Sequence, residues 1–215
     1  MENKSLVVKK IVKVWDENGI IDKNIDFLLN KTKKINFPLT PNSKQIIQDL
    51  HDAYREIPCA GIAANQIGYD KSIFIGLKNY DDTIDPEEIE EKESKHSDEE
   101  QEGNEYADNF EVYINPQIDK VDNNSIQTEV EGCLSIPLLS LRIERYDKIR
   151  VRYYDQNGKA IKRTLKGFMS KLFQHELDHL NGLLMLQANI VEGFAQEESF
   201  VTPELYNELQ TKISP

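Results

Sequence analysis

Two of the four histidines in the chain, His175 and His179, stand on either side of Glu176 in a His-Glu-x-x-His pattern. Residues four positions apart on an α-helix lie on the same face, so both imidazoles could bind one divalent metal, with Glu176 as a proton carrier beside it. A surface helix with two incidental histidines is the alternative. Phe168, Leu172 and His175 recur at helical spacing, however, so the histidine face continues an apolar face and is expected to point inward.

A third metal ligand has to come from another segment, because two histidines rarely complete a site. Only two cysteines are present, Cys59 and Cys133, and Cys133 follows an apolar-alternating run. A thiolate with two neutral imidazoles makes a tetrahedral site with one position left open for water. A lone cysteine is more often a small buried residue, but the histidine pair favours a ligand role here. We therefore predict one divalent metal on Cys133, His175 and His179.

Three segments resemble the motifs of the peptide deformylase family, and they occur in the family's order. They are Gly61-Ile62-Ala63-Ala64-Asn65-Gln66, Glu131-Gly132-Cys133-Leu134-Ser135 and Gln174-His175-Glu176-Leu177-Asp178-His179. The resemblance covers roughly residues 40–78 and 110–187. The first motif departs from the family twice, with Cys59 at a usual glycine and Asn65 at a usual proline. These departures concern the shape of the substrate groove and not the metal site.

The resemblance implies a metallohydrolase that removes the formyl group from the N-terminal formylmethionine of newly made polypeptides and releases formate. The substrate would be an N-formylmethionyl nascent peptide that lies along the first motif as an added strand. The family favours Fe(II), with Zn(II) or Ni(II) able to occupy the same ligands. Cysteine and histidine accept all three metals, so the residue types do not separate them.

The resemblance also implies catalytic roles by position. Glu176 would accept a proton from water and pass it to the leaving amine. The side-chain amide of Gln66 and the backbone N–H of Leu134 would donate to the oxyanion of the tetrahedral intermediate, with a turn position as the alternative role for Gln66. Asp178 and Ser135 are candidates for hydrogen bonds that orient these groups, against the alternatives of a solvated acid and a strand-end hydroxyl.

The methionine pocket of the substrate would be lined by three residues carried over from the family, namely Gly61, Phe168 and Leu172. Lys171 would lie at the rim of this pocket. Core packing is a compatible second role for the two apolar side chains. Glu131 and Arg145 are candidates for a salt bridge that stiffens the loop carrying Cys133.

At 215 residues, with 39% apolar and 30% charged residues, the chain has the composition of one soluble globular domain with a substantial core. The chain has no run of about 18 apolar residues, which a membrane span would need, and the N-terminus lacks the pattern of a secretory signal. Two cysteines in unrelated contexts do not form a disulfide framework. We therefore expect a single catalytic domain over residues 1–215, in the cytoplasm and without a membrane partner.

The net charge of −12 comes from one segment. Residues 80–108 hold fourteen acids and only two bases, Lys92 and Lys95, so the rest of the chain is electrically balanced. We expect this segment to be a solvated, disordered insertion, with docking to a basic surface such as the ribosome as its alternative role. The balanced remainder disfavours direct nucleic-acid binding, which needs a basic excess to meet phosphates.

Three helices are expected from start and stop signals. Thr40-Pro41 opens a helix that keeps its apolar period to about residue 57. Gly167 precedes the metal-binding helix and Gly182 follows it. Thr202-Pro203 opens a last helix to about residue 212.

Strands are expected from β-prone or alternating runs between these helices, over residues 72–77, 110–114, 117–121, 126–131, 138–144, 147–154 and 160–166. The first two should pair as neighbours, and Asn157-Gly158 is a hairpin turn. Residues 7–15 are also β-prone and belong to an N-terminal extension within residues 1–39. The order of elements predicts an α+β fold, with antiparallel sheets around a central metal-binding helix.

Two other functions fit parts of the pattern. A zinc peptidase of the His-Glu-x-x-His kind would need a further ligand downstream, and no histidine follows His179. A metal-binding protein without catalysis would need neither Glu176 nor Gln66, and both are present. The deformylase interpretation is therefore the one that we carry forward.

Overall fold

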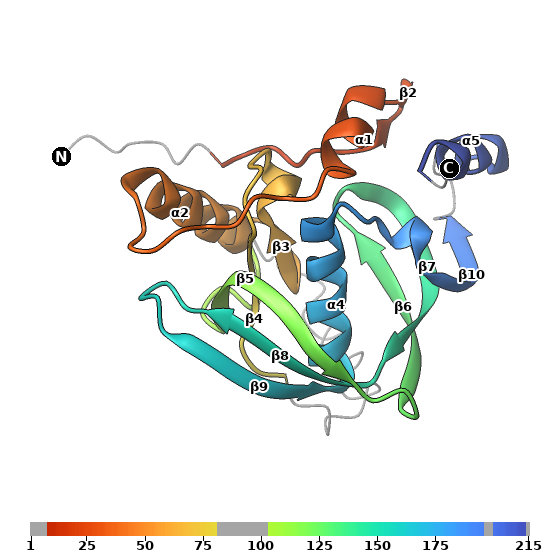
Figure 1. The fold of residues 1–215 in the computed structure, drawn as a ribbon. Helices are drawn as coiled ribbons and strands as arrows, with labels where there is room; N and C mark the ends of the chain where they lie inside the picture. Colours follow the sequence, from red (N-terminus) through yellow and green to blue (C-terminus); the bar gives the residue numbers. More distant parts are fainter. Residues whose placement is uncertain (1–7, 81–102, 196–199, 214–215) are drawn as a thin grey trace.

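Helix α4 (Gly167–Asn181) lies in the middle of the molecule, between two antiparallel sheets (Figure 1). The computed structural model describes residues 8–80, 103–195 and 200–213. One sheet has the strand order β3-β4-β5-β8-β9 and the other has the order β10-β7-β6. Every pairing in both sheets is antiparallel. The predicted α+β class, with antiparallel sheets around the metal-binding helix, is confirmed.

The two sheets are built from eight strands, and helices and a short strand pair complete the described part of the chain. The larger sheet is built from β3 (Gly61–Ala63), β4 (Ile73–Leu77), β5 (Phe110–Val121), β8 (Lys148–Tyr154) and β9 (Ala160–Lys166). The smaller sheet is built from β6 (Ile126–Cys133), β7 (Ile136–Tyr146) and β10 (Asn189–Ala195). The other elements are β1 (Trp15–Asp16), β2 (Gly19–Ile20), α1 (Asp22–Leu28), α2 (Pro41–Glu56), α5 (Pro203–Ile213) and two short 3₁₀ helices, η1 (Ala64–Ile67) and η2 (Met185–Gln187).

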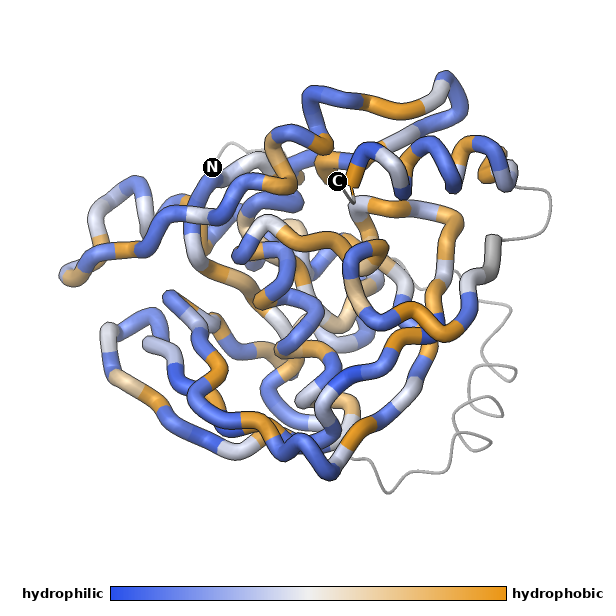
Figure 2. Tube along the Cα trace, turned by 45° about the vertical axis from the view of Figure 1, so that its right-hand side comes forward, coloured by the Kyte–Doolittle hydropathy of each residue, from blue (hydrophilic) through white to orange (hydrophobic). Residues whose placement is uncertain are grey.

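Strand β4 is buried on both faces, because helices cover both sides of the larger sheet. Ile73 and Ile75 pack in one apolar cluster with residues of α2, and Phe74 and Leu77 pack in another with residues of α4. Burying each of these side chains contributes about 1.5–3 kcal/mol. By contrast, β8 alternates between buried apolar and exposed polar residues. Figure 2 shows that short hydrophobic and hydrophilic stretches follow one another along the coloured trace.

The helices begin and end near the residues predicted for them. Thr40 caps α2, because its Oγ1 accepts a hydrogen bond of 3.2 Å from the Ser43 N–H, and Pro41 takes the first helical position. Gly182 ends α4 at φ +76°, and a Cβ there would lie 2.3 Å from the carbonyl oxygen of Leu29. The position therefore requires glycine. None of the helices in the described part of the chain is long and apolar enough to cross a membrane.

The predicted pairing of residues 72–77 with 110–114 is confirmed by the register of β4 and β5. The expected separate strand over 117–121 is wrong, because β5 continues to Val121. The pairing of β5 with β8 shifts register between Ile114 and Gln117. Asn115, at φ +51°, and Pro116 lie in this irregularity, so they do not end the strand. Strand β10 and helix α1 were not predicted.

The N-terminal segment departs from the strand expected over residues 7–15. Of the described residues, Trp15 and Asp16 alone form a strand there. The preceding stretch makes single backbone bonds to two different segments, from Val12 N–H to the Gln66 carbonyl (2.7 Å) and from Val14 N–H to the Ser135 carbonyl (2.9 Å). An extended chain that bridges two segments in this way forms no continuous ladder.

The expectation of a disordered insertion over residues 80–108 is wrong at the C-terminal end of that range. Residues 81–102 lie outside the described residues. Asn104 is 7% exposed and Tyr106 packs against two apolar clusters, so the end of the segment belongs to the folded body. The composition of the segment did not indicate this packing, because the residues that pack are only one buried amide and one aromatic ring among many acidic residues.

Candidate active site

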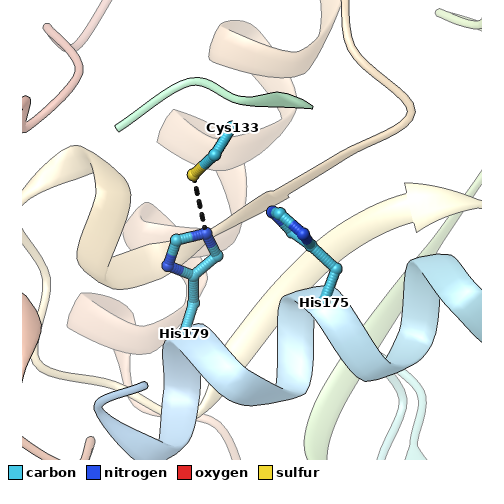
Figure 3. Close-up of side chains that lie close together, drawn as sticks. All are labelled: Cys133, His175 and His179. Atoms are coloured by element: carbon cyan, nitrogen blue, oxygen red, sulfur yellow. Dashed lines mark hydrogen bonds between the residues drawn. The ribbon is translucent and has the colours of Figure 1, made fainter. Parts of the chain in front are cut away.

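Cys133, at the end of β6, meets the two histidines of α4 (Figure 3). The Cys133 Sγ lies 3.2 Å from Nε2 of His179, and one ligand atom from each of the three residues falls within 4.8 Å of the others. Both His175 and His179 point from adjacent turns of the helix toward the strand end, as their four-residue spacing predicts. The structure therefore brings together all three predicted metal ligands.

The donor atoms of this cluster fit one divalent metal. Nδ1 of His175 lies 2.9 Å from the Glu131 carboxylate, so Nε2 is the nitrogen that it offers to an ion. One sulfur and two imidazole nitrogens suit zinc, iron or nickel. Oε2 of Glu176 is buried and has no hydrogen-bond partner among the described residues, as expected for a group that meets a ligand or water at the site.

The site adjusts the acidity of two of its groups. Burial alone would raise the pKa of the Cys133 thiol, but the two neighbouring imidazoles lower that pKa to about 5. The thiolate, which is the form that binds metals, is therefore favoured at neutral pH. Burial raises the pKa of Glu176 to about 7, against the opposing effect of the two histidines.

A buried ion-pair network contacts His175 at its Nδ1 atom. Arg145 donates from Nε and Nη2 to the two carboxylate oxygens of Glu131, at 2.9 and 3.0 Å, and from Nη1 to Asp178 at 2.5 Å. Burial opposes ionisation of Glu131, but hydrogen bonds from His175 and Arg145 lower its pKa to about 2. The predicted Glu131–Arg145 salt bridge is present, and Asp178 extends it.

Gln66 directs its amide nitrogen toward the sulfur of Cys133. Its Oε1 accepts a hydrogen bond of 2.9 Å from the Ala63 N–H, and its Nε2 lies 3.4 Å from Ser135 Oγ and 3.8 Å from Cys133 Sγ. Gln66 is 1% exposed and belongs to the short η1 helix at the end of β3. Leu134 is half-buried and lines the same groove, directly after Cys133.

An open groove of about 640 Å³ runs past these residues. Gly61, Phe168 and Leu172 all line it, together with Lys171, whose Nζ lies 5.1 Å from the centre of the Phe168 ring. A Cβ on Gly61 would lie 2.7 Å from Oε1 of Glu176, so glycine permits the close approach of β3 to the metal-binding helix. The residues predicted for the substrate pocket therefore share one groove.

The two departures from the family motif have different surroundings. Cys59 is half-buried in the groove wall, and burial raises the pKa of its thiol to about 12, so the thiol stays neutral. Asn65 is buried, and its Nδ2 donates a hydrogen bond of 2.6 Å to the backbone carbonyl of His179. The Asn65 side chain thus ties η1 to the metal-binding helix, an attachment that proline could not make.

Another contact at the groove was not predicted. The ring of Tyr80 stacks on Phe168 with 4.4 Å between ring centres. These residues are far apart in the sequence, and Tyr80 stands at the edge of an acidic stretch with no periodic pattern. No sequence signal could have indicated this contact.

A His-Glu-x-x-His helix that faces a buried cysteine beside an open groove is the arrangement of a metal-dependent hydrolase. The sequence profile described as "Polypeptide deformylase" matches residues 9–191, which include most of the N-terminal residues that we expected to be an extension. A peptide deformylase of Elusimicrobium minutum is 34% identical over 184 residues, covering 84% of this chain and 87% of that protein. One from Aquifex aeolicus is 33% identical over 158 residues, covering 74% and 79%.

Solved structures of peptide deformylases have the same fold as this chain. The peptide deformylase of Plasmodium falciparum is 25% identical with a TM-score of 0.61, covering 95% of this chain and 92% of that one. The enzyme of Thermotoga maritima shares the fold at 24% identity with a TM-score of 0.62, covering 86% and 99%. The chain belongs to the peptide deformylase family, hydrolases that remove the formyl group from N-terminal formylmethionine.

Proposed function

We propose that this chain deformylates N-formylmethionyl nascent peptides with one divalent metal held by Cys133, His175 and His179. The observation that carries the proposal is the convergence of the three ligand atoms within 4.8 Å, next to Glu176 and in the wall of an open groove. A bound divalent ion would supply a Lewis acid, which polarises a carbonyl group and acidifies a water molecule. The family resemblance favours Fe(II), and Zn(II) or Ni(II) suits the same ligands.

Glu176 is the residue to which we assign proton transfer. Its Oε1 faces Gly61 across the groove wall, and its Oε2 has no hydrogen-bond partner within the described ranges. The carboxylate can therefore accept a proton from a water molecule in the groove and pass it to the leaving amine. Helix α4 packs against strands of both sheets, which fixes the position of the helix that carries Glu176.

Gln66 and Leu134 are the residues to which we assign stabilisation of the oxyanion. The Ala63 N–H occupies Oε1 of Gln66 and so turns the Nε2 donor toward Cys133 and Ser135, beside the place where the reacting carbonyl oxygen would lie. The Leu134 N–H comes directly after Cys133, in the turn between β6 and β7. Donors that are fixed before the reaction need no reorganisation in the transition state, which is why such groups lower the barrier.

The substrate peptide would add to the free edge of β3. This strand is the end strand of the larger sheet, so the edge away from β4 can accept an extended peptide. The methionine side chain would contact Gly61, Phe168 and Leu172, with Lys171 at the rim. Because β3 approaches Glu176 closely at Gly61, the space at the reacting carbon suits a small acyl group such as formyl.

Formylated peptides are products of translation, so we assign the reaction to the cytoplasm and to chains that emerge from the ribosome. We add to this proposal that the acidic segment docks to the ribosome. Residues 81–102 of that segment lie outside the described residues. No membrane partner or direct nucleic-acid contact is proposed. The zinc-peptidase alternative lacks its further ligand, since the metal-ligand cluster found in the described chain consists of Cys133, His175 and His179.

The proposal is tested by offering the protein two substrates in parallel, a formyl-methionyl tripeptide and an unformylated longer peptide. Samples are loaded anaerobically with Fe(II), Zn(II) or Ni(II). We expect formate release from the first substrate, fastest with Fe(II), and no internal cleavage of the second. Internal cleavage without formate release would favour the zinc peptidase, and no reaction with full metal occupancy would favour the non-catalytic alternative.

A further inference from the structure

The residues that end the acidic segment are joined to the wall of the substrate groove. Asn104 lies between the C-terminus of α2 and the loop that leads into β3, and it is 7% exposed. Its Nδ2 donates to the backbone carbonyls of Tyr54 (2.7 Å) and Cys59 (2.9 Å). Its backbone N–H donates to the carbonyl of Arg55 at 2.8 Å. One asparagine therefore joins three carbonyls from two adjoining segments.

Two of these carbonyls belong to the last turn of α2, where carbonyl groups lack partners within the helix. The remaining polar atoms of Asn104 are also used, since its Oδ1 accepts from the Tyr106 N–H (3.0 Å) and its backbone carbonyl accepts from the Ala107 N–H (3.0 Å). A side chain with every hydrogen-bonding group engaged has one well-defined position. Asn104 can therefore act as a rigid connection.

The third carbonyl belongs to Cys59, and Cys59, Ala60 and Gly61 line the groove in succession. The Ala60 carbonyl is held on the side of the sheet by the Leu77 N–H at 2.9 Å. The Cys59 carbonyl is held on the side of α2 by Asn104. Asn104 thus supplies the second attachment of the backbone just before β3, the strand to which the proposed substrate adds.

We propose that Asn104 is a positioning residue for the peptide-binding edge of β3. An edge strand binds an extended peptide through backbone groups that must keep their spacing and direction. Loosening residues 59–61 would weaken peptide binding without touching the metal ligands, which lie on β6 and α4. The inference rests on the proposed function and adds to it a residue that lies outside all three family motifs.

The test uses Asn104→Ala and Asn104→Asp in the full chain, with Asn109→Ala as the matched control. Aspartate keeps the size of the side chain but removes both Nδ2 hydrogen bonds. Asn109 is exposed in the same stretch and donates to the Asn79 carbonyl at 2.8 Å, and neither residue lines the groove. We measure KM and kcat for a formyl-methionyl tripeptide, metal content, melting temperature, and amide hydrogen exchange over residues 59–63.

Both Asn104 variants should raise KM about fivefold or more, while kcat changes less than twofold and metal content stays at one per chain. Amide exchange over residues 59–63 should quicken in the same variants, and the control should match the parent protein. A lower melting temperature with unchanged KM and unchanged exchange would overturn the inference and leave Asn104 as a helix cap alone. Equal losses in kcat and metal content would overturn it too.

Two further arms keep the outcome decisive. If Asn104→Ala and Asn104→Asp do not fold, Asn104→Ser, which keeps one donor, is measured in the same way and should raise KM above that of the parent protein with metal content unchanged; parent-like KM and parent-like amide exchange in Asn104→Ser would overturn the inference. If the parent protein and Asn109→Ala both release no formate, the proposed function fails. In that case unchanged amide exchange over residues 59–63 in the Asn104 variants would overturn the positioning role independently of activity.

Discussion

Glu131 holds His175 through a hydrogen bond of 2.9 Å between its carboxylate and Nδ1 of the imidazole. The same carboxylate accepts two hydrogen bonds from Arg145, so its position is fixed by a buried bidentate ion pair. The orientation of the His175 ring, and with it the direction of Nε2, follows from this arrangement. A residue on β6 therefore orients the imidazole of His175 on α4, one of the three proposed metal ligands.

Glu131→Gln should weaken metal binding about 10- to 100-fold, because the hydrogen bond that orients His175 loses its charge. The glutamine keeps the size of the side chain and limits disruption of the core. Competition with a chelator measures the Kd of the metal. The control is Glu129→Gln, which alters an exposed acid on the same strand and should leave that Kd unchanged. An unaltered Kd in Glu131→Gln would show that ring orientation does not depend on Glu131.

Cys133→Ala and His179→Ala should each abolish stoichiometric metal binding, since two ligands alone do not hold the ion. Elemental analysis of purified protein gives the metal content per chain. The other cysteine provides the control, because Cys59→Ala should retain one metal per chain. Full occupancy in Cys133→Ala would contradict the ligand assignment.

Glu176→Ala should retain the metal but lose turnover about a hundredfold or more, as expected when a general base is removed. Its position on the helix allows it to reach a water molecule in the groove but does not make it one of the three ligands. Steady-state formate release and metal content, measured on the same sample, separate the two effects. If kcat fell by less than tenfold, another group would have to carry the proton.

Cys59→Gly should lower KM for formyl-methionyl peptides, with a smaller change in kcat and no change in metal content. Cys59 lines the groove beside Ala60 and Gly61, and removing its side chain widens the groove at that point. A wider groove acts on binding more than on the chemical step. A KM that is unchanged or higher in the glycine variant would mean that the local backbone has already adapted to cysteine.

The sequence predicted the elements whose signals are local. Thr40-Pro41 opened α2 as expected, Gly182 closed α4, and the alternation in β8 matched its burial. The convergence of Cys133, His175 and His179 could be predicted for the same reason, since two of them lie on one helix face and the third lies in a specific short motif.

What the sequence could not predict depends on contacts between distant segments. Strand β10 is defined by its pairing with β7 rather than by a strong pattern of its own. The hydrogen bond from Asn65 to the His179 carbonyl joins residues 114 positions apart. The attachment of Asn104 to Cys59 occurs in a stretch whose composition indicated only a solvated loop. Such contacts arise from the assembled fold and leave no periodic signal in the chain.

Formate release from a formyl-methionyl tripeptide by the Fe(II)-loaded protein tests the central claim most directly. The account predicts one formate per peptide consumed, turnover that disappears when the metal is removed and returns when it is restored, and a loss of about a hundredfold or more in Glu176→Ala. A protein that carries one metal per chain and releases no formate from this peptide would contradict the account.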